Sequence, residues 1–317
     1  MDRKFVNVVV LLTLLIFASS SIFSQRRGGP KFSDWAPVTR LPPPINSAFD
    51  DQAPVLSKNE KTLFFTSNRP GSLGPSEDIW VSTRKSKNSP WTRPVNLEAL
   101  NTPSIERLRS LTSDGRVLLF MSDRPGSGQT DIWASVRENP NDDYGWSEPV
   151  NLGANINSES SELAARYLFA NGGRTRKLFF SSNRPGGFGG PDIYESTIGP
   201  NGFEPSVNIF ELNSPSVETC FWVRDDGLEL IFISNRPELT GDLSQNEVWA
   251  ATRDSVDEAW SAPAKLGPQV NAEGYQDVNP SLSFDGRTML LASKRPGGIG
   301  PAGTFDIYLT TRRHANE

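Results

Sequence analysis

The chain has 317 residues, a formal net charge of −5 and a pI near 5.2. No cluster of lysine and arginine accompanies this acidic balance, which excludes nucleic acid and anionic membrane surfaces as partners. The sole histidine is His314 and the sole cysteine is Cys220. An internal disulfide, a catalytic triad with a histidine base and a histidine-ligated zinc site are therefore excluded, and neither a metal nor a cofactor is expected.

The N-terminal segment 1–24 has the layout of a secretory signal peptide. Arg3 and Lys4 precede an apolar stretch from Val8 to Ala18, which is too short for an ordinary transmembrane helix. The protein is therefore expected in the periplasm or outside the cell, without membrane insertion once the segment is removed. An uncleaved membrane anchor is the alternative that the sequence leaves open. Residues 25–34 are expected to form a linker.

A repeated unit of about 55 residues fills most of the remaining chain. Each copy contains an acid shortly after an asparagine, a short apolar run, an Arg-Pro phrase with a glycine-rich turn, and a strand that begins Asp-Ile-Trp or a close variant. Asp-Gly pairs at 114–115, 226–227 and 285–286 indicate hairpins, because both residues accept a positive φ. The Arg-Pro phrases occupy residues 67–80, 122–133, 182–194, 234–249 and 293–308.

The last strand of the unit is displaced from one end of the chain to the other. An aromatic residue, a proline and an apolar strand follow four of the phrases, and a fifth copy, Trp35 to Leu41, stands ahead of all of them. We therefore expect this strand to complete the blade formed by residues 277–312, since closure removes exposed sheet edges. The sequence predicts an all-β, five-bladed β-propeller of four-stranded blades over residues 35–312, followed by a tail, 313–317.

These motifs resemble the WD40-like repeat of TolB-type propellers. The shared pattern is an acid, then Ser-x-Asp-Gly with an apolar run, then Arg-Pro-Gly and Asp-Ile-Trp or Asp-Ile-Tyr, and it covers about residues 35–312. The resemblance implies an exported propeller of the cell envelope. The chain departs from TolB because it has no room for the separate N-terminal α/β domain of that protein.

Arginines and later acids recur at matching places in every unit. A guanidinium can bridge a carboxylate and several carbonyls, so we expect these residues to tie the glycine-rich turns together or to staple neighbouring blades. A feature present in every copy usually serves the repeat itself. The residues are Arg69, Asp78, Arg124, Asp131, Arg184, Asp192, Arg236, Glu247, Arg295 and Asp306.

A second set of acids precedes the innermost strand of each unit and is expected near one mouth of the central channel. Pairing with the repeated arginines, a bound cation or water cluster, and catalysis by paired carboxylates are the three alternatives for this ring. We call these residues the ring acids: Asp51, Glu106, Glu162, Glu218 and Asp277.

Residues shortly after the ring acids break the repeat. Large or charged side chains stand there in three units, and such residues are common anchors of recognition surfaces. Filling of gaps between blades is the alternative, above all for the aromatic residues. The candidate partner-binding residues are Arg109, Arg166, Tyr167, Phe221 and Trp222.

The sequence thus favours a monomeric, non-enzymatic binding or scaffolding propeller that recognises an envelope protein or a glycan. The alternative is a glycoside hydrolase on a five-bladed propeller with catalytic carboxylates at the channel mouth. An enzyme would expose unpaired acids from different blades, and a binding protein would show its acids paired with arginines.

Overall fold

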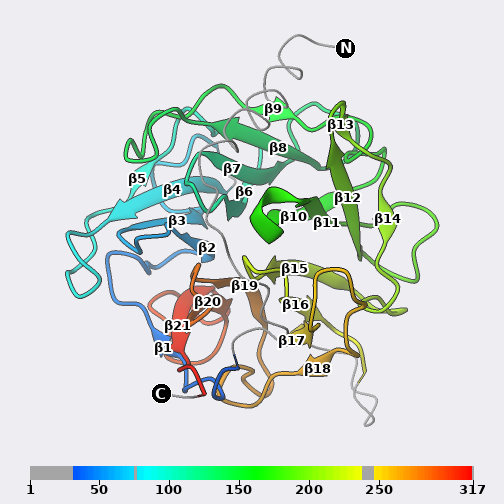
Figure 1. Ribbon diagram of the computed structural model, residues 1–317. Coiled ribbons are helices and arrows are strands. Elements are labelled where there is room, and N and C mark those ends of the chain that lie inside the picture. The colour runs from blue at the N-terminus through cyan, green and yellow to red at the C-terminus, as the bar shows by residue number, and fades with distance from the viewer. Residues whose placement is uncertain (1–30, 75–76, 238–245, 316–317) are drawn as a thin grey trace.

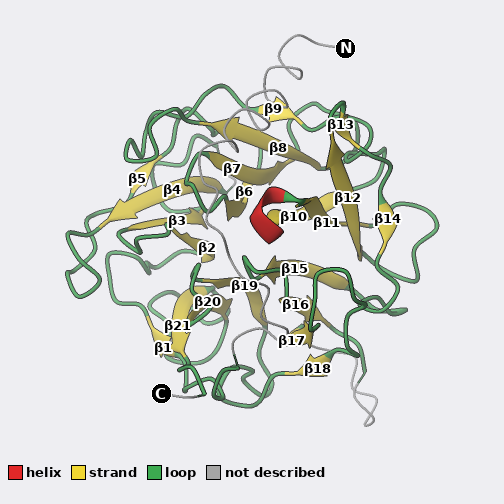
Figure 2. Cartoon of the chain, in the orientation of Figure 1, coloured by secondary structure: helices red, strands yellow, loops and turns green. Residues whose placement is uncertain are grey.

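Five antiparallel sheets form a ring around a central channel in the computed structural model, which describes residues 31–74, 77–237 and 246–315 (Figure 1). The predicted five-bladed propeller is confirmed. The expected signal peptide lies outside the described residues. Strands dominate the chain, and a 3₁₀ turn, η1 (Asn171–Gly173), caps the long hairpin of blade 3 (Figure 2).

Each blade runs from an innermost strand at the channel to a two-residue outer strand. Blade 1 contains β2 (Asp51–Leu56), β3 (Thr62–Ser67), β4 (Asp78–Thr83) and β5 (Val95–Asn96), and blade 2 contains β6 (Glu106–Leu111), β7 (Val117–Ser122), β8 (Asp131–Val136) and β9 (Val150–Asn151). Blade 3 contains β10 (Glu162–Ala170), β11 (Thr175–Ser182), β12 (Asp192–Gly199), β13 (Gly202–Phe203) and β14 (Val207–Asn208). Blade 4 contains β15 (Glu218–Val223), β16 (Glu229–Ser234), β17 (Glu247–Thr252) and β18 (Ala264–Lys265). Blade 5 contains β19 (Asp277–Leu282), β20 (Thr288–Ser293), β21 (Asp306–Thr311) and β1 (Thr39–Arg40).

Blade 5 takes its outer strand from the N-terminal end of the described chain, as the displaced repeat predicts. Thr39 pairs with Leu309 and Arg40 with Tyr308. Flanking bonds extend the contact, since the amide of Ala36 donates to the carbonyl of Thr311 at 2.9 Å. The ring is therefore closed by pairing between the two ends of the propeller, which covers the outer edge of β21.

The expected linker and tail are partly ordered against each other. Phe32 forms a bridge with His314, and their rings stack with centroids 4.8 Å apart. The Arg312 guanidinium lies 3.9 Å from the centroid of the Phe32 ring. The pairing of the two chain ends thus extends beyond the predicted boundaries at residues 35 and 312.

Apolar strand residues build the core between the blades. The second strand of blade 1, β3, is buried along its full length because blades pack against both of its faces. The predicted Asp-Gly hairpins are present, and Gly115, Gly227 and Gly286 have φ values of 72°, 74° and 71°. Among the described residues, no helix is long and apolar enough to cross a membrane.

Candidate functional site

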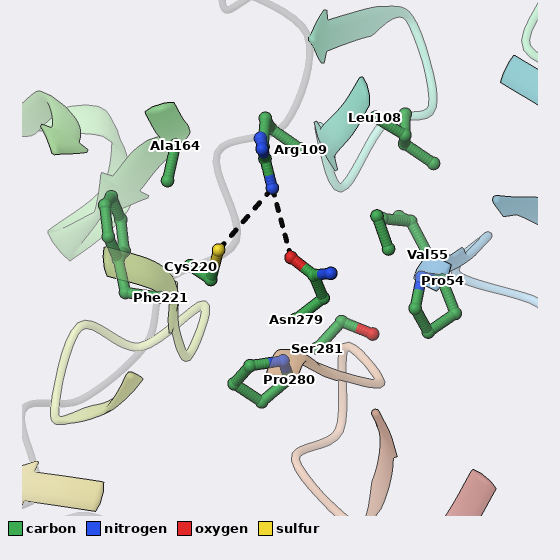
Figure 3. A pocket seen from close by; sticks show the side chains of 11 residues that line it. Pro54, Val55, Leu108, Arg109, Ala164, Cys220, Phe221, Asn279, Pro280 and Ser281 are labelled. Atoms are coloured by element: carbon green, nitrogen blue, oxygen red, sulfur yellow. Dashed lines mark hydrogen bonds between the residues drawn. The ribbon is translucent and has the colours of Figure 1, made fainter. Parts of the chain in front are cut away.

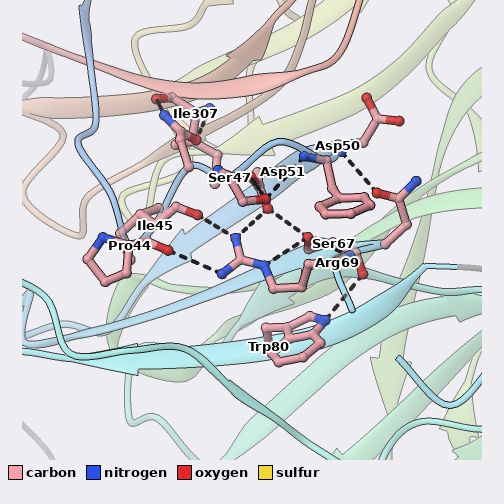
Figure 4. Close-up of polar contacts among 12 residues, drawn as sticks. Pro44, Ile45, Ser47, Asp50, Asp51, Ser67, Arg69, Trp80 and Ile307 are labelled. Carbon is pink, nitrogen blue, oxygen red and sulfur yellow. Dashed lines mark hydrogen bonds and ion pairs between the residues drawn. The ribbon is translucent and has the colours of Figure 1, made fainter. Parts of the chain in front are cut away.

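The five ring acids are buried and paired with the repeated arginines. None of the ring carboxylates has exposed surface, and each forms an ion pair with its arginine, with Nη2 2.5 to 3.1 Å from a carboxylate oxygen. Asp51 shows the pattern: one oxygen binds Arg69 and Ser67, and the other binds the amide and hydroxyl of Ser47 (Figure 4). Because they have no exposed surface, the ring acids are not accessible to a sugar or a cation.

The repeated arginines connect each glycine-rich loop with the segment that enters the blade. Arg69 donates to the carbonyls of Pro44 and Ile45, and its guanidinium lies 4.8 Å from the centroid of the Phe65 ring (Figure 4). The later acids are bound elsewhere. Asp78 accepts bonds from the Leu73 amide at 2.8 Å and from the Asn96 side chain at 2.6 Å, which fixes the glycine-rich loop to the outer strand. Glu247, in the corresponding position of blade 4, forms an ion pair with Lys265 at 2.7 Å.

Four of the candidate partner-binding residues are buried, which corrects the expectation of an exposed surface. Arg166 stacks on Trp222, with its guanidinium 3.6 Å from the ring centroid, and forms an ion pair with Asp225 at 2.5 Å. Burial lowers the pKa of Arg166 to about 10. Tyr167 and Phe221 belong to apolar clusters between neighbouring blades. These side chains fill the gaps between blades, so they cannot anchor a partner on the surface.

Arg109 instead points across the central channel (Figure 3). Its Nη1 donates to Asn279 Oδ1 at 3.1 Å and lies 3.7 Å from Cys220 Sγ. Burial lowers the pKa of Arg109, and no carboxylate of the described chain lies within 4.0 Å of its guanidinium. The channel cavity beside it measures ≈ 20 Å³, room for about one water molecule. A sugar ring does not fit in this cavity.

A series of hydrogen-bonded polar side chains that does not follow the five-fold repeat lies at the mouth of the channel. We call it the mouth cluster: Gln52, Glu77, Arg107, Arg109 and Asn279. Arg107 binds Glu77, Gln52 donates to Glu77 Oε1 at 2.7 Å, and Asn279 donates to Gln52 Oε1 at 3.0 Å. Together with the bond from Arg109 to Asn279, these contacts join residues of blades 1, 2 and 5 in one network.

Glu77 is the carboxylate of the mouth cluster, and sequence reasoning missed it. Its backbone carbonyl accepts a bond from the Glu106 amide at 2.9 Å, and the same bond recurs in every blade. The residues in the corresponding positions are Thr130, Pro191, Asn246 and Phe305, so only blade 1 carries an acid there. The available signal was this departure directly before the Asp-Ile-Trp phrase.

The ion pair with Glu77 stabilises the charge of Arg107. Burial opposes the charge of Arg107, but the hydrogen bond and charge of Glu77 outweigh it and raise the pKa of Arg107. The side chain of Glu77 keeps 14% of its surface exposed and that of Arg107 keeps 37%. A second acid, Asp123, is exposed and contributes a charge near Arg107, and its Oδ1 accepts a hydrogen bond from the Ile105 amide at 2.7 Å. Two carboxylates thus act on one partly exposed guanidinium. Among the described residues, no group of three or more His, Cys, Asp and Glu side chains is arranged to hold a metal ion.

The fold resembles that of glycoside hydrolases. An α-L-arabinofuranosidase from Podospora anserina is 12% identical, with 90% of this chain and 98% of that chain covered and a TM-score of 0.51. The catalytic domain of a GH62 α-L-arabinofuranosidase from Coprinopsis cinerea gives 12% identity, 89% and 98% coverage and a TM-score of 0.55. An endo-arabinase from Bacteroides thetaiotaomicron is 16% identical, with 88% of this chain and 97% of that chain covered and a TM-score of 0.54. No family model matches the sequence, and no curated protein is significantly similar to it.

These matches correct two expectations. The ring resembles glycoside hydrolase propellers, so the assignment to TolB-like, WD40-like proteins was wrong. The expectation of a non-enzymatic binding or scaffolding module was wrong with it, because these neighbours are enzymes. The repeat suggested TolB because its recurring residues are those that stabilise a blade, and such residues indicate the fold and not the function. At 11–16% identity, the likeness to these enzymes concerns the fold alone.

Proposed function

We propose that the protein is an exported glycoside hydrolase whose glycan lies over the mouth cluster. The observation that carries the proposal is Glu77, a partly exposed carboxylate that one blade alone presents at the channel mouth. The cavity beside Arg109 is too small for a sugar, so a substrate would rest on the mouth cluster and contact this carboxylate. The likeness to arabinofuranosidases and an endo-arabinase makes arabinose-containing glycans the first substrates to test.

Hydrolysis of a glycosidic bond requires two carboxylates with different roles. Arg107 and Gln52 donate hydrogen bonds to the Glu77 carboxylate and fix its position, and its exposed part would act as the base that activates water. Asp123 would supply the proton to the leaving oxygen. The ring acids take no part in this scheme because they have no exposed surface.

The test is turnover of arabinan, arabinoxylan and 4-nitrophenyl α-L-arabinofuranoside by the chain without residues 1–24. Glu77→Gln is expected to lower kcat/KM by about 100-fold or more, since loss of general acid–base catalysis typically costs 10²–10⁴-fold, while the melting temperature stays unchanged. Glu195→Gln is the matched control, because Glu195 also pairs with a cation but lies in blade 3, on β12. Full activity in Glu77→Gln, or no turnover of any glycan by the parent chain, would contradict the proposal.

A further inference from the structure

A second cavity lies at the seam between blades 5 and 1, where β20 and β21 pass beside β2 (Figure 1). It measures ≈ 270 Å³ and has leucine side chains on its walls. The polar groups that face it come from Glu60, Arg84, Lys87 and Asn88. Ligand pockets of drug-like molecules measure about 300–1,000 Å³, so this volume suits a single sugar-sized ring.

The turn beside this cavity departs from the repeat at Glu60. Its amide donates to the Ser57 carbonyl at 2.8 Å, and Gly115, Gly227 and Gly286 make the same bond in their blades. Glu60 has a φ of 56°, a left-handed conformation that is unfavourable for a residue with a Cβ. Its carboxylate accepts a bond from Lys87 at 2.8 Å. Blade 1 thus keeps an acid where three other blades keep glycine.

Arg84 is the second departure. Its Nε donates to the carbonyl of Glu60, and Arg137, Arg253 and Arg312 bind the corresponding glycine carbonyls in the same way. The guanidinium of Arg137 also donates to the Asp143 carboxylate, and that of Arg312 donates to the Glu229 carboxylate. The guanidinium of Arg253 donates to a backbone carbonyl. No carboxylate oxygen of the described chain lies within 4.0 Å of the Arg84 guanidinium. Burial lowers the pKa of Arg84, against the charge of Glu60.

The third departure is the aromatic side chain under this arginine. In four blades an arginine covers a tryptophan, and Trp35, Trp146 and Trp260 are at most 9% exposed. Trp91, 4.3 Å from Arg84, is only partly buried and lines the cavity. An aromatic wall, two cations and one carboxylate therefore meet at the seam. Among the side chains that line the cavity, Arg84 and Lys87 are cationic and Glu60 is anionic, so the lining has an excess of positive charge.

We propose that this seam pocket binds one carboxylate-bearing sugar ring, a hexuronate. The Arg84 guanidinium would take the carboxylate, because its Nη atoms offer the forked donors that match a carboxylate. The leucine walls and Trp91 would cover the apolar face of the ring, and Asn88 with the Thr288 and Thr311 hydroxyls would meet its hydroxyl groups. The site is separate from the mouth cluster, so it extends beyond the proposed hydrolase activity and does not depend on it.

Titration calorimetry with sodium D-galacturonate and D-glucuronate tests the proposal, with D-galactose, D-glucose and acetate as probes that lack one of the two features. A hexuronate should bind at least about tenfold more tightly than its neutral sugar and than acetate, since a charge-assisted hydrogen bond and the ring contacts each add affinity. If a tetragalacturonide binds as well as the monosaccharide, the ligand is a hexuronate residue within a glycan. If the tetragalacturonide does not bind, the ligand is the free monosaccharide acid.

Three variants distinguish this site from others. Arg84→Gln should weaken hexuronate binding about tenfold or more, and Glu77→Gln should leave it unchanged. Glu60→Gly restores the glycine of the repeat and frees Lys87, so it should tighten binding several-fold without loss of thermal stability. Equal affinity for hexuronate and neutral sugar, binding of acetate as tight as that of hexuronate, or unchanged affinity in Arg84→Gln would overturn the proposal.

Discussion

At the scale of single residues, the repeated arginine is the main structural device of each blade. Arg184 binds the ring acid Glu162 at 3.1 Å, and further bonds join it to Ser182 and Ser206. Its partner is thus the ring acid and not the later acid Asp192, which binds the amide of Phe188. The guanidinium also lies 4.8 Å from the Phe180 ring centroid, so one side chain joins loop, strand and carboxylate.

Arg184→Ala is expected to lower the free energy of unfolding by about 3 kcal/mol or more, because it leaves a buried carboxylate without its counter-charge. Urea denaturation at pH 7 measures the loss. Lys177→Ala is the control in the same blade, since its pair with Glu195 is partly exposed, with 24% of each side chain accessible, and should contribute less than about 1 kcal/mol. The double variant Arg184→Ala/Glu162→Gln should recover part of the loss. Equal stability of Arg184→Ala and Lys177→Ala would show that the ion pair contributes nothing.

The later acid Asp78 predicts a pH dependence of stability. Burial raises its pKa above the usual range, against hydrogen bonds from Asn96 and Leu73. Its contribution to stability is therefore present below the pKa of the unfolded state and is lost as the pH rises through the folded pKa. Asp78→Asn should abolish this loss, so the stability of the variant relative to the parent should increase as the pH rises above the unfolded pKa of about 4.

Urea denaturation at several pH values measures this effect, with Asp257→Asn as an exposed control. The amide oxygen of the variant can still accept the bonds from Leu73 and Asn96, while the buried Oδ1, which has no partner, is replaced. A difference between variant and parent that does not change with pH would contradict the raised pKa.

Some of these residue roles could be predicted from the sequence and others could not. The repeat shows that Arg69 and its counterparts serve the blade, because a residue kept in every copy has a role in every copy. Arg166 and Arg109 occupy similar irregular positions, yet one is stacked between blades and the other points across the channel. Their difference depends on packing between strands far apart in sequence, which a local pattern does not record.

At the scale of elements, β1 decides whether the ring is closed. Its position was predictable because the aromatic landmark at Trp35 is a displaced copy of the unit's last strand. The seam pocket beside it was not predictable, because its walls come from β2, β3, β20 and β21, from the turn between β2 and β3, and from the segments that follow β1 and β4. A repeat pattern describes what blades share, whereas this cavity arises where blade 1 departs from that pattern.

Deletion of residues 1–41 is expected to open the ring and to expose the outer edge of β21 and one face of blade 5. Removal of Trp35, which is 9% exposed, also uncovers apolar surface against blade 4. The truncated chain should melt at a lower temperature and self-associate through the free edge. Light scattering and thermal denaturation measure both effects, and deletion of residues 1–30 is the control. A truncated chain that stays monomeric with an unchanged melting temperature would show that β1 is dispensable.

At the scale of the whole molecule, the seam pocket couples ligand binding to ring closure. Blades 5 and 1 both line it, so a bound hexuronate would join the last blade to the first. At a concentration of 100 times Kd the ligand should add about 2.7 kcal/mol to the free energy of unfolding. For a chain of this size the melting temperature should rise by about 5 °C or more, and scanning calorimetry measures the shift. D-glucose should cause no shift of the melting temperature.

The shift should vanish in Arg84→Gln and in the chain without residues 1–41, because the first lacks the carboxylate-binding group and the second lacks Leu41 in the pocket wall. A shift of equal size in all three proteins would place the ligand elsewhere on the molecule.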